Sequence, residues 1–123
     1  MYRPRRARKR PPKYQNTKLV VEGHSFDSIK EATRYKQLAL LKAHGYISDL
    51  KCQVPFTLIP KQRNALGKTE ICVRYVADFV YMDIEMGCRV VEDVKSDVTR
   101  KLPVYVIKRK LMLQVHGITI REV

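Results

Sequence analysis

The sequence predicts a single α/β domain in which helices flank a mixed β-sheet. Helical periodicity occupies two segments, near residues 26–45 and 99–116, and short runs rich in β-branched and aromatic residues lie between them. A chain of 123 residues can bury one hydrophobic core but has little left for a second. The expected order is a helix, three strands, a second helix and a last strand.

The first helix is expected to begin near Phe26. Apolar residues recur at helical spacing from residue 29 to residue 41, and Asp27 or Ser28 can cap the start. Gly45 stands where a left-handed C-cap belongs, so the helix should end there.

The segment after this helix is expected to be extended. Its runs cover about residues 47–52, 55–60, 70–81 and 88–95, with turns near 64–68 and 85–87. The second helix is expected to bury a stripe formed by Val104, Ile107, Leu111 and Val115, with Pro103 in its first turn. Gly117 ends that helix, and residues 118–123 close the sheet.

Charge indicates a polyanionic partner. The chain has 25 Lys and Arg against 12 Asp and Glu, a net charge of +13, which attracts nucleic acid. Apolar runs are too short to span a bilayer, and no apolar stretch with a cleavage site follows the basic start. Three scattered cysteines are typical of reduced intracellular thiols. We therefore expect a cytoplasmic protein that binds DNA, with no membrane partner.

The first 16 residues are predicted to be a disordered basic arm, and residues 17–123 the folded domain. The first 13 residues hold seven Lys or Arg, three Pro and no acid, a composition that cannot build a core. The alternative is a tail that only keeps the protein soluble. We expect phosphate contacts from the arm's basic side chains, which are Arg3, Arg5, Arg6, Arg8, Lys9 and Arg10.

Two aspartates stand where apolar side chains are expected. Asp78 lies in V-A-D-F-V-Y and Asp93 in V-V-E-D-V-K, both otherwise typical of buried strands. An unpaired buried carboxylate costs several kcal/mol, and a shared cation removes that cost. Oxygen ligands favour Mg²⁺, for which Mn²⁺ can substitute.

Lys95 follows Asp93 by two residues, so both side chains point to the same face of a strand. A lysine beside metal-bound carboxylates can hold an attacking water and stabilise charge on a phosphate. The alternative is a surface ion pair at a strand end. Glu31 has two interpretations as well: a capping-box partner of Ser28, or a third carboxylate aimed at the sheet.

These residues form a pattern that resembles the PD-(D/E)XK nuclease superfamily: a helix-borne Glu, a strand Asp, then (D/E)-x-K on the next strand. A narrower similarity, to a phage and prophage family with endonuclease-like features in that superfamily, covers about residues 22 to 123. It is carried by the blocks F-D-S-I-K-E-A, G-Y-I-S-D-L-K-C-Q-V-P-F, Y-V-A-D-F-V-Y, V-V-E-D-V-K-S and I-K-R-K-L-M.

The resemblance implies a restriction-endonuclease-like α-β-β-β-α-β core and a role for each matching residue. Glu31, Asp78 and Asp93 would bind the metal and Lys95 would be the catalytic lysine. Gln53, in Q-V-P-F, would support them.

Glu92, next to Asp93, is a rival ligand. Strand alternation places it on the face opposite Lys95, which favours Asp93, but a bulge would reverse that choice.

The function implied is that of a Mg²⁺-dependent DNA endonuclease of phage type, with no small-molecule cofactor. Small basic members of the superfamily include Holliday-junction resolvases, so branched DNA and a homodimer are expected. Lys101, Lys108 and Arg109 are candidate DNA contacts, or else a solvated helix face. The alternatives are a non-catalytic nucleic-acid-binding protein and a nuclease subunit of a transposition or replication complex.

Overall fold

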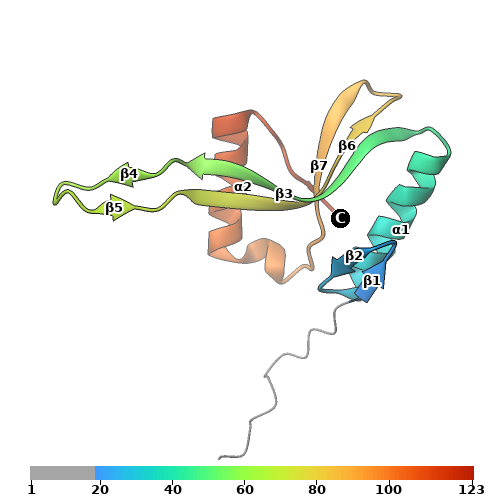
Figure 1. Cartoon of the computed structure of the whole chain (residues 1–123), viewed down its shortest axis with the longest axis horizontal. Helices are drawn as coiled ribbons and strands as arrows, with labels where there is room; N and C mark the ends of the chain where they lie inside the picture. The colour runs from blue at the N-terminus through green and yellow to red at the C-terminus, as the bar shows by residue number, and fades with distance from the viewer. Residues whose placement is uncertain (1–18) are drawn as a thin grey trace, which may run out of the picture.

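The computed structural model describes residues 19–123, so the arm predicted for residues 1–16 lies outside the described part. Two helices and a four-stranded sheet form the body (Figure 1). The elements are β1 (Leu19–Val21), β2 (His24–Phe26), α1 (Ile29–Ala43), β3 (Ile47–Ile59), β4 (Gln62–Arg63), β5 (Thr69–Glu70), β6 (Val73–Asp83), β7 (Cys88–Asp93), a 3-10 turn η1 (Thr99–Lys101), α2 (Pro103–His116) and β8 (Arg121–Glu122).

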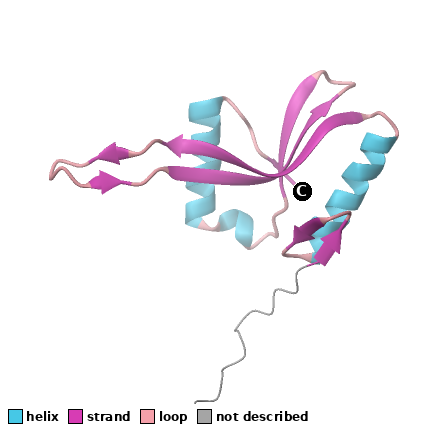
Figure 2. Ribbon diagram, in the orientation of Figure 1, coloured by secondary structure: helices cyan, strands magenta, loops and turns pink. Residues whose placement is uncertain are grey.

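The central sheet is mixed, as predicted. Its strand order is β3-β6-β7-β8, in which β3, β6 and β7 pair antiparallel and β8 joins β7 in parallel. Figure 2 shows the two helices on opposite sides of the point where these strands cross. The prediction of one small α/β domain with a mixed sheet and two helices is confirmed.

Two hydrophobic clusters meet at the middle of β6. One joins α1 to the sheet through Tyr35, Leu38 and Phe79. The other joins α2 to the sheet through Ala77 and Met112. Asp78 lies between Ala77 and Phe79, and therefore at the boundary of the two clusters. The chain places a carboxylate where neither helix covers the sheet completely.

β3 is one strand, whereas the sequence predicted two short ones. The two predicted runs, about residues 47–52 and 55–60, are continuous through Pro55, although proline cannot donate a ladder hydrogen bond. Since β3 is an edge strand of the sheet, the missing N–H of Pro55 is tolerated. Its pairing with β6 runs from Ile47 to Ile59, with irregularities at either end.

The predicted buried stripe of α2 was wrong for three of its four residues, whereas the fourth, Leu111, is partly buried and packs against the core. Tyr105 and Met112 are the buried residues of this helix, whereas Val104, Ile107 and Val115 are exposed. Apolar residues occur on several faces of α2, so periodicity alone did not determine which face packs. The larger side chains of Tyr105 and Met112 fill the space above the sheet.

The hairpin of β1 and β2 was not predicted, whereas that of β4 and β5 lies at the turn predicted near residues 64–68. β1 pairs with β2 through a two-residue turn of Glu22 and Gly23, both with positive φ; an x-Gly turn between apolar runs is a hairpin signal. β4 pairs with β5 beyond the ends of β3 and β6. Within residues 19–123, no helix combines the length and apolar composition needed to cross a bilayer.

Candidate active site

The two central strands separate where the predicted carboxylates lie. Residue pairing between β6 and β7 ends at Phe79 opposite Glu92, so Asp78 and Asp93 come directly beyond the last pair. The Val94 N–H donates to Asp78 Oδ2 at 2.8 Å, where a further backbone bond would otherwise form. The sheet thus opens around a side chain, and the two aspartates face each other across the opening.

Asp93 is a buried carboxylate with one oxygen satisfied and one available. Its Oδ2 accepts a hydrogen bond from the Tyr75 hydroxyl. Its Oδ1 lies 3.1 Å from Lys95 Nζ, yet it makes no hydrogen bond within residues 19–123. The ion pair is close but poorly directed, so this buried oxygen keeps lone pairs for a cation or a water.

Lys95 is fixed at both its backbone and its side chain. Its N–H donates to the Val123 carbonyl at 3.0 Å, and Lys30 Nζ donates to its carbonyl at 2.8 Å. Its ammonium group lies 4.7 Å from the centre of the Tyr105 ring, a cation–π distance. A quarter of the side chain, 24%, is exposed. The ammonium group is therefore positioned beside Asp93 while still open to a solute.

The environment of Asp78 disfavours its charge. Burial, together with the neighbouring carboxylates of Asp93 and Glu31, raises the pKa of Asp78 to about 7, against the lowering effect of the hydrogen bond from Val94. Neighbouring carboxylates repel one another unless a proton or a cation separates them. Such crowding at a partly exposed point is typical of functional sites.

Neutralising this carboxylate should stabilise the metal-free protein. In Asp78→Asn, the amide oxygen still accepts from Val94, and Gln53 can turn its own amide to match. Because the pKa of Asp78 is about 7 when folded against an ordinary value of 3.8, the charge penalty grows from about pH 4 to pH 7 and is constant above. We expect a gain of about 1–3 kcal/mol in the free energy of unfolding at about pH 8.

The measurement is thermal or urea unfolding in EDTA. Most of the gain should be lost at about pH 4.5, where the folded protein already protonates Asp78. Asp97→Asn is the matched control, since the Asp97 side chain is 93% exposed, and it should show no such pH dependence. A destabilised Asp78→Asn protein at about pH 8 would contradict the expected repulsion.

Glu31 lies in the first turn of α1. Its N–H donates to Ser28 Oγ at 3.1 Å, so Ser28, one of the two predicted caps, is the N-cap of the helix. The reciprocal bond of a capping box, from the Ser28 N–H to the Glu31 carboxylate, is not among the hydrogen bonds of residues 19–123. Burial raises the pKa of Glu31, as do the charges of Asp27 and Asp93, whereas Lys95 lowers it. The Glu31 carboxylate is thus within electrostatic range of the site.

Glu92 is on the other face of β7 and already has partners. It is fully buried, and the Arg34 guanidinium donates to both of its oxygens, at 2.7 and 2.8 Å. The Tyr81 hydroxyl donates to it as well. Alternation holds at this point of β7, with no bulge, so the structure separates Glu92 from Lys95 and places Asp93 beside it.

Gln53 lies opposite Asp78 in the pairing of β3 with β6, between Cys52 and Val54. Its Nε2 donates to Asp78 Oδ1 at 3.3 Å. Its backbone has a φ of 53°, a left-handed conformation that is rare and strained for a residue inside a strand. The supporting position expected for Gln53 is thus occupied, at the expense of local backbone strain.

A pocket of about 380 Å³ opens beside Asp93 and Lys95, between the sheet and α2. Tyr75 and Tyr105 line it, and Arg74 and Lys108 bring positive charge to the same wall. Sequence patterns did not single out Arg74 or Tyr75. Tyr75 is two residues before the buried Ala77, and alternation could have placed it on the face of Asp93.

The other predicted nucleic-acid contacts are placed differently. Lys101 is exposed at the end of η1. Arg109 pairs with Glu122 at 3.4 Å, and Arg100 approaches the same glutamate at 3.8 Å. Arg109 therefore binds its own sheet through β8. The six arm residues, Arg3, Arg5, Arg6, Arg8, Lys9 and Arg10, lie outside the described residues.

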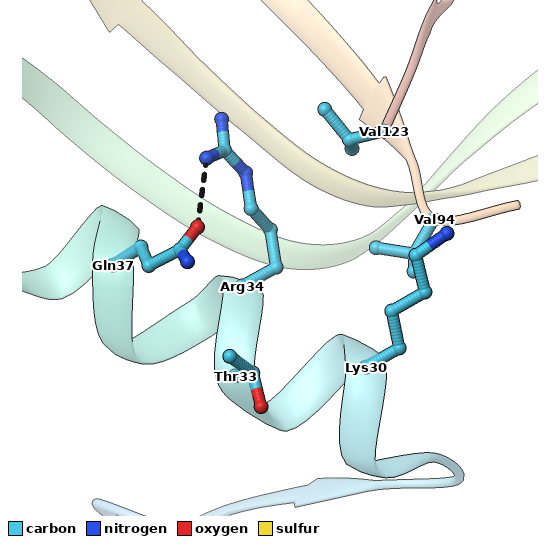
Figure 3. A pocket seen from close by; sticks show the side chains of 6 residues that line it. All are labelled: Lys30, Thr33, Arg34, Gln37, Val94 and Val123. Atoms are coloured by element: carbon cyan, nitrogen blue, oxygen red, sulfur yellow. Dashed lines mark hydrogen bonds between the residues drawn. The ribbon is translucent and has the colours of Figure 1, made fainter.

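A second pocket, of about 370 Å³, lies between α1 and the end of β7 (Figure 3). Lys30, Arg34 and Gln37 extend into it from one side of α1, and Val94 faces them. An Arg34 terminal nitrogen donates to Gln37 Oε1 at 3.1 Å. Arg34 binds the Glu92 carboxylate and Lys30 binds the Lys95 carbonyl. The residues of this pocket therefore stabilise the strand end that carries the candidate site.

The carboxylates fit a magnesium ion. No three His, Cys, Asp or Glu side chains among residues 19–123 are gathered closely enough to bind one ion directly. Mg²⁺ does not require that, because it keeps several waters and needs only one or two carboxylates. Asp93 Oδ1, buried and without a hydrogen bond, and Asp78, whose charge is disfavoured as it stands, are such a pair. Glu31 would reach the ion's waters.

Comparison with known proteins gives the family but no activity. Residues 11–120 match the family described as protein of unknown function (DUF1064). No curated protein matches the chain, and no solved structure does. The match spans the described domain from β1 through the strands of the candidate site, so the chain belongs to the DUF1064 family.

Proposed function

We propose that this protein is a Mg²⁺-dependent DNA endonuclease and that its family is a branch of the PD-(D/E)XK superfamily. One observation carries the proposal: Asp78, Asp93 and Lys95 converge where β6 and β7 separate. Folding alone does not call for this arrangement, because two buried acids and a lysine could be replaced by apolar side chains without loss of packing. A catalytic use accounts for all three residues together.

The reaction is hydrolysis of a phosphodiester. A water oxygen attacks the phosphorus, the bond from phosphorus to one bridging oxygen breaks, and the leaving oxygen takes up a proton. The products are a phosphomonoester end and a hydroxyl end. The Lys95 ammonium donates hydrogen bonds to the attacking water and to the phosphate, and its charge offsets the negative charge that develops there. Asp93 and the Tyr105 ring hold that ammonium group in position.

Asp78 and Asp93 would hold the metal, with Glu31 on its hydration shell. A bound Mg²⁺ supplies charge stabilisation on the phosphate and a more acidic water. Gln53 keeps the Asp78 carboxylate oriented through its hydrogen bond to Oδ1, and Tyr75 does the same for Asp93 Oδ2. Both carboxylates would therefore already be oriented for an ion, which lowers the entropy lost on binding.

DNA is the substrate that the charge favours. The net charge is +13, and Arg74 and Lys108 stand on the wall of the pocket next to Lys95, where the phosphates flanking the cut would lie. We propose branched DNA of the Holliday-junction kind as the preferred form. A symmetric junction is cut by two sites, which requires two copies of a chain with one site each.

A homodimer is proposed through the exposed face of α2. Ile107 and Val115 are exposed apolar residues of α2 that do not line the pocket beside Asp93 and Lys95, and Ile107 is 58% exposed. Ile107→Glu should place a charge in the interface and raise the dimer dissociation constant by about tenfold or more. Sedimentation velocity measures this, with Leu40→Glu on α1 as the control, since Leu40 is similarly exposed. A wild-type monomer at all concentrations would contradict the dimer.

The test of function is a panel of substrates: linear duplex, single strand, flap and four-way junction, each with Mg²⁺, Mn²⁺ or EDTA. Cleavage that requires the metal and favours the junction is expected. Binding to all substrates without cutting under any metal would make the non-catalytic nucleic-acid-binding protein the better account. Cutting that begins only when a second protein is added would indicate a subunit of a transposition or replication complex.

A further inference from the structure

β3 and β6 continue past the body of the protein as a long hairpin (Figures 1 and 2). We call its outer part, residues 60–72, the hairpin arm. It contains β4 and β5, which form a two-stranded sheet of their own. No residue of the hairpin arm is buried. The hairpin arm therefore adds nothing to either hydrophobic cluster.

The hairpin arm is nevertheless a built structure. Asn64 organises its turn: the side-chain oxygen accepts from the N–H groups of Leu66 and Lys68, at 2.9 and 3.1 Å, and its amide nitrogen donates to Glu70 at 3.3 Å. Gly67 provides the positive φ that the turn requires. A two-stranded hairpin without a core is marginally stable in water, so a defined arm of this kind indicates a use outside the fold.

The two faces of the hairpin arm differ in charge. Gln62 pairs with Glu70 and Arg63 with Thr69, and alternation puts Lys61 on the face of Arg63. That face carries two positive charges and no acid. On the other face, Lys68 stands on the side of Glu70 and their charges cancel. A hollow of about 340 Å³ on the hairpin arm is lined by Lys61, Gln62, Arg63 and Thr69.

Its shape and reach fit duplex DNA. A two-stranded ribbon is narrow enough to enter the major groove. Ten residues separate Asp78 from Lys68, and ten residues of extended strand span about 33 Å at about 3.3 Å per residue. One turn of DNA is about 34 Å long. The tip residue Leu66 is 82% exposed, and an apolar side chain there can contact thymine methyl groups in the major groove.

We propose that the hairpin arm binds duplex DNA about one helical turn from the cleavage site, with Lys61 and Arg63 on backbone phosphates. This inference rests on the proposed function for its choice of polyanion. It makes the hairpin arm a second point of contact that orients the duplex relative to Asp78 and Asp93, so the hairpin arm contributes to where the enzyme cuts.

The test measures binding without cleavage. Fluorescence anisotropy follows a labelled duplex of about three helical turns in EDTA at several salt concentrations. Lys61→Gln/Arg63→Gln should weaken binding by about tenfold, and the slope of log K against log salt should fall by about 1.8, or 0.9 per lost phosphate contact. Lys61→Gln alone should lower the slope by about half as much.

Two controls separate position from total charge. Lys68→Gln removes a lysine from the opposite face of the same hairpin, and Lys36→Gln/Lys42→Gln removes two exposed charges from α1. Both should leave the affinity within about twofold of the wild type. Equal losses in the control and test variants would overturn the proposal, because the effect would then be one of net charge.

Failure of the hairpin arm and failure of the nuclease are distinguishable. Binding in EDTA does not depend on cleavage. If the protein cuts no substrate but Lys61→Gln/Arg63→Gln still weakens DNA binding, the hairpin arm is supported and the nuclease is not. If the enzyme is active and Lys61→Gln/Arg63→Gln binds DNA as tightly as the wild type, the DNA contact of the hairpin arm is overturned and the proposed nuclease function still stands. Two results with unchanged DNA affinity would overturn the DNA contact. If Leu66→Asn dissociates a dimer, the partner of the hairpin arm is a second copy of the chain. If Lys61→Gln/Arg63→Gln no longer binds phosphatidylserine vesicles, the partner is a membrane surface.

Discussion

Lys95→Ala should lower the rate of DNA cleavage by about 10²-fold or more while DNA affinity stays within about twofold of the wild type. The ammonium group lies at the carboxylates, not on the outer surface, so its loss removes charge stabilisation in the transition state and little ground-state binding. Single-turnover cleavage with Mg²⁺ measures the rate, and anisotropy in EDTA measures the affinity.

The matched control is Lys36→Ala, which removes an exposed lysine from α1 and should cut normally. Because Lys95 also pairs with Asp93, unfolding of Lys95→Ala should be measured alongside its activity. A variant that is folded, binds DNA and still cuts at the wild-type rate would remove Lys95 from the site. A loss of activity in proportion to a loss of folded protein would make its role structural.

Arg34→Ala should lower the free energy of unfolding by about 3–5 kcal/mol, which is the range for a buried charge left without its partner. Glu92 is fully buried, and Arg34 supplies two hydrogen bonds to it. Arg34 is itself 23% exposed, so water can enter the gap and the lower end of the range is expected. Urea unfolding measures the loss, and the double variant Arg34→Met/Glu92→Met should recover much of it.

Substitutions of Glu92 and Asp93, which are neighbours on β7, test which of the two acids serves the site. Glu92→Gln should unfold more easily and still cut DNA at temperatures where it is folded. Asp93→Asn should stay folded and lose Mg²⁺-dependent cleavage. The reverse result, with Glu92→Gln folded and inactive and Asp93→Asn active, would move the role of metal ligand to Glu92.

The order of the two helices and the four strands of the central sheet could be predicted because it depends on local patterns. Periodicity located α1 and α2, and the capping role of Ser28 followed from its position before an apolar stripe. The conflict between an acid and its apolar neighbours was enough to single out Asp78 and Asp93. These features are encoded within a few residues of where they act.

Features that depend on distant residues were not predictable. Strand alternation favoured Asp93 over Glu92, but the group that neutralises Glu92 was not foreseen, because Arg34 is 58 residues from it in the chain. The buried face of α2 was missed because apolar residues surround that helix, and the sheet beneath it selects Tyr105. The continuity of β3 through Pro55 depended on which strand lies at the edge, a property of the whole sheet.

The conformation of β3 has a consequence for self-association. A long exposed strand edge is a template on which another chain can add a strand, leading to aggregation. The outer edge of β3 is interrupted three times, by the left-handed residues Asp49 and Gln53 and by Pro55, which has no N–H to offer. At the opposite edge, β8 is only two residues long. The distortion that orients Gln53 toward Asp78 therefore also prevents the sheet from growing.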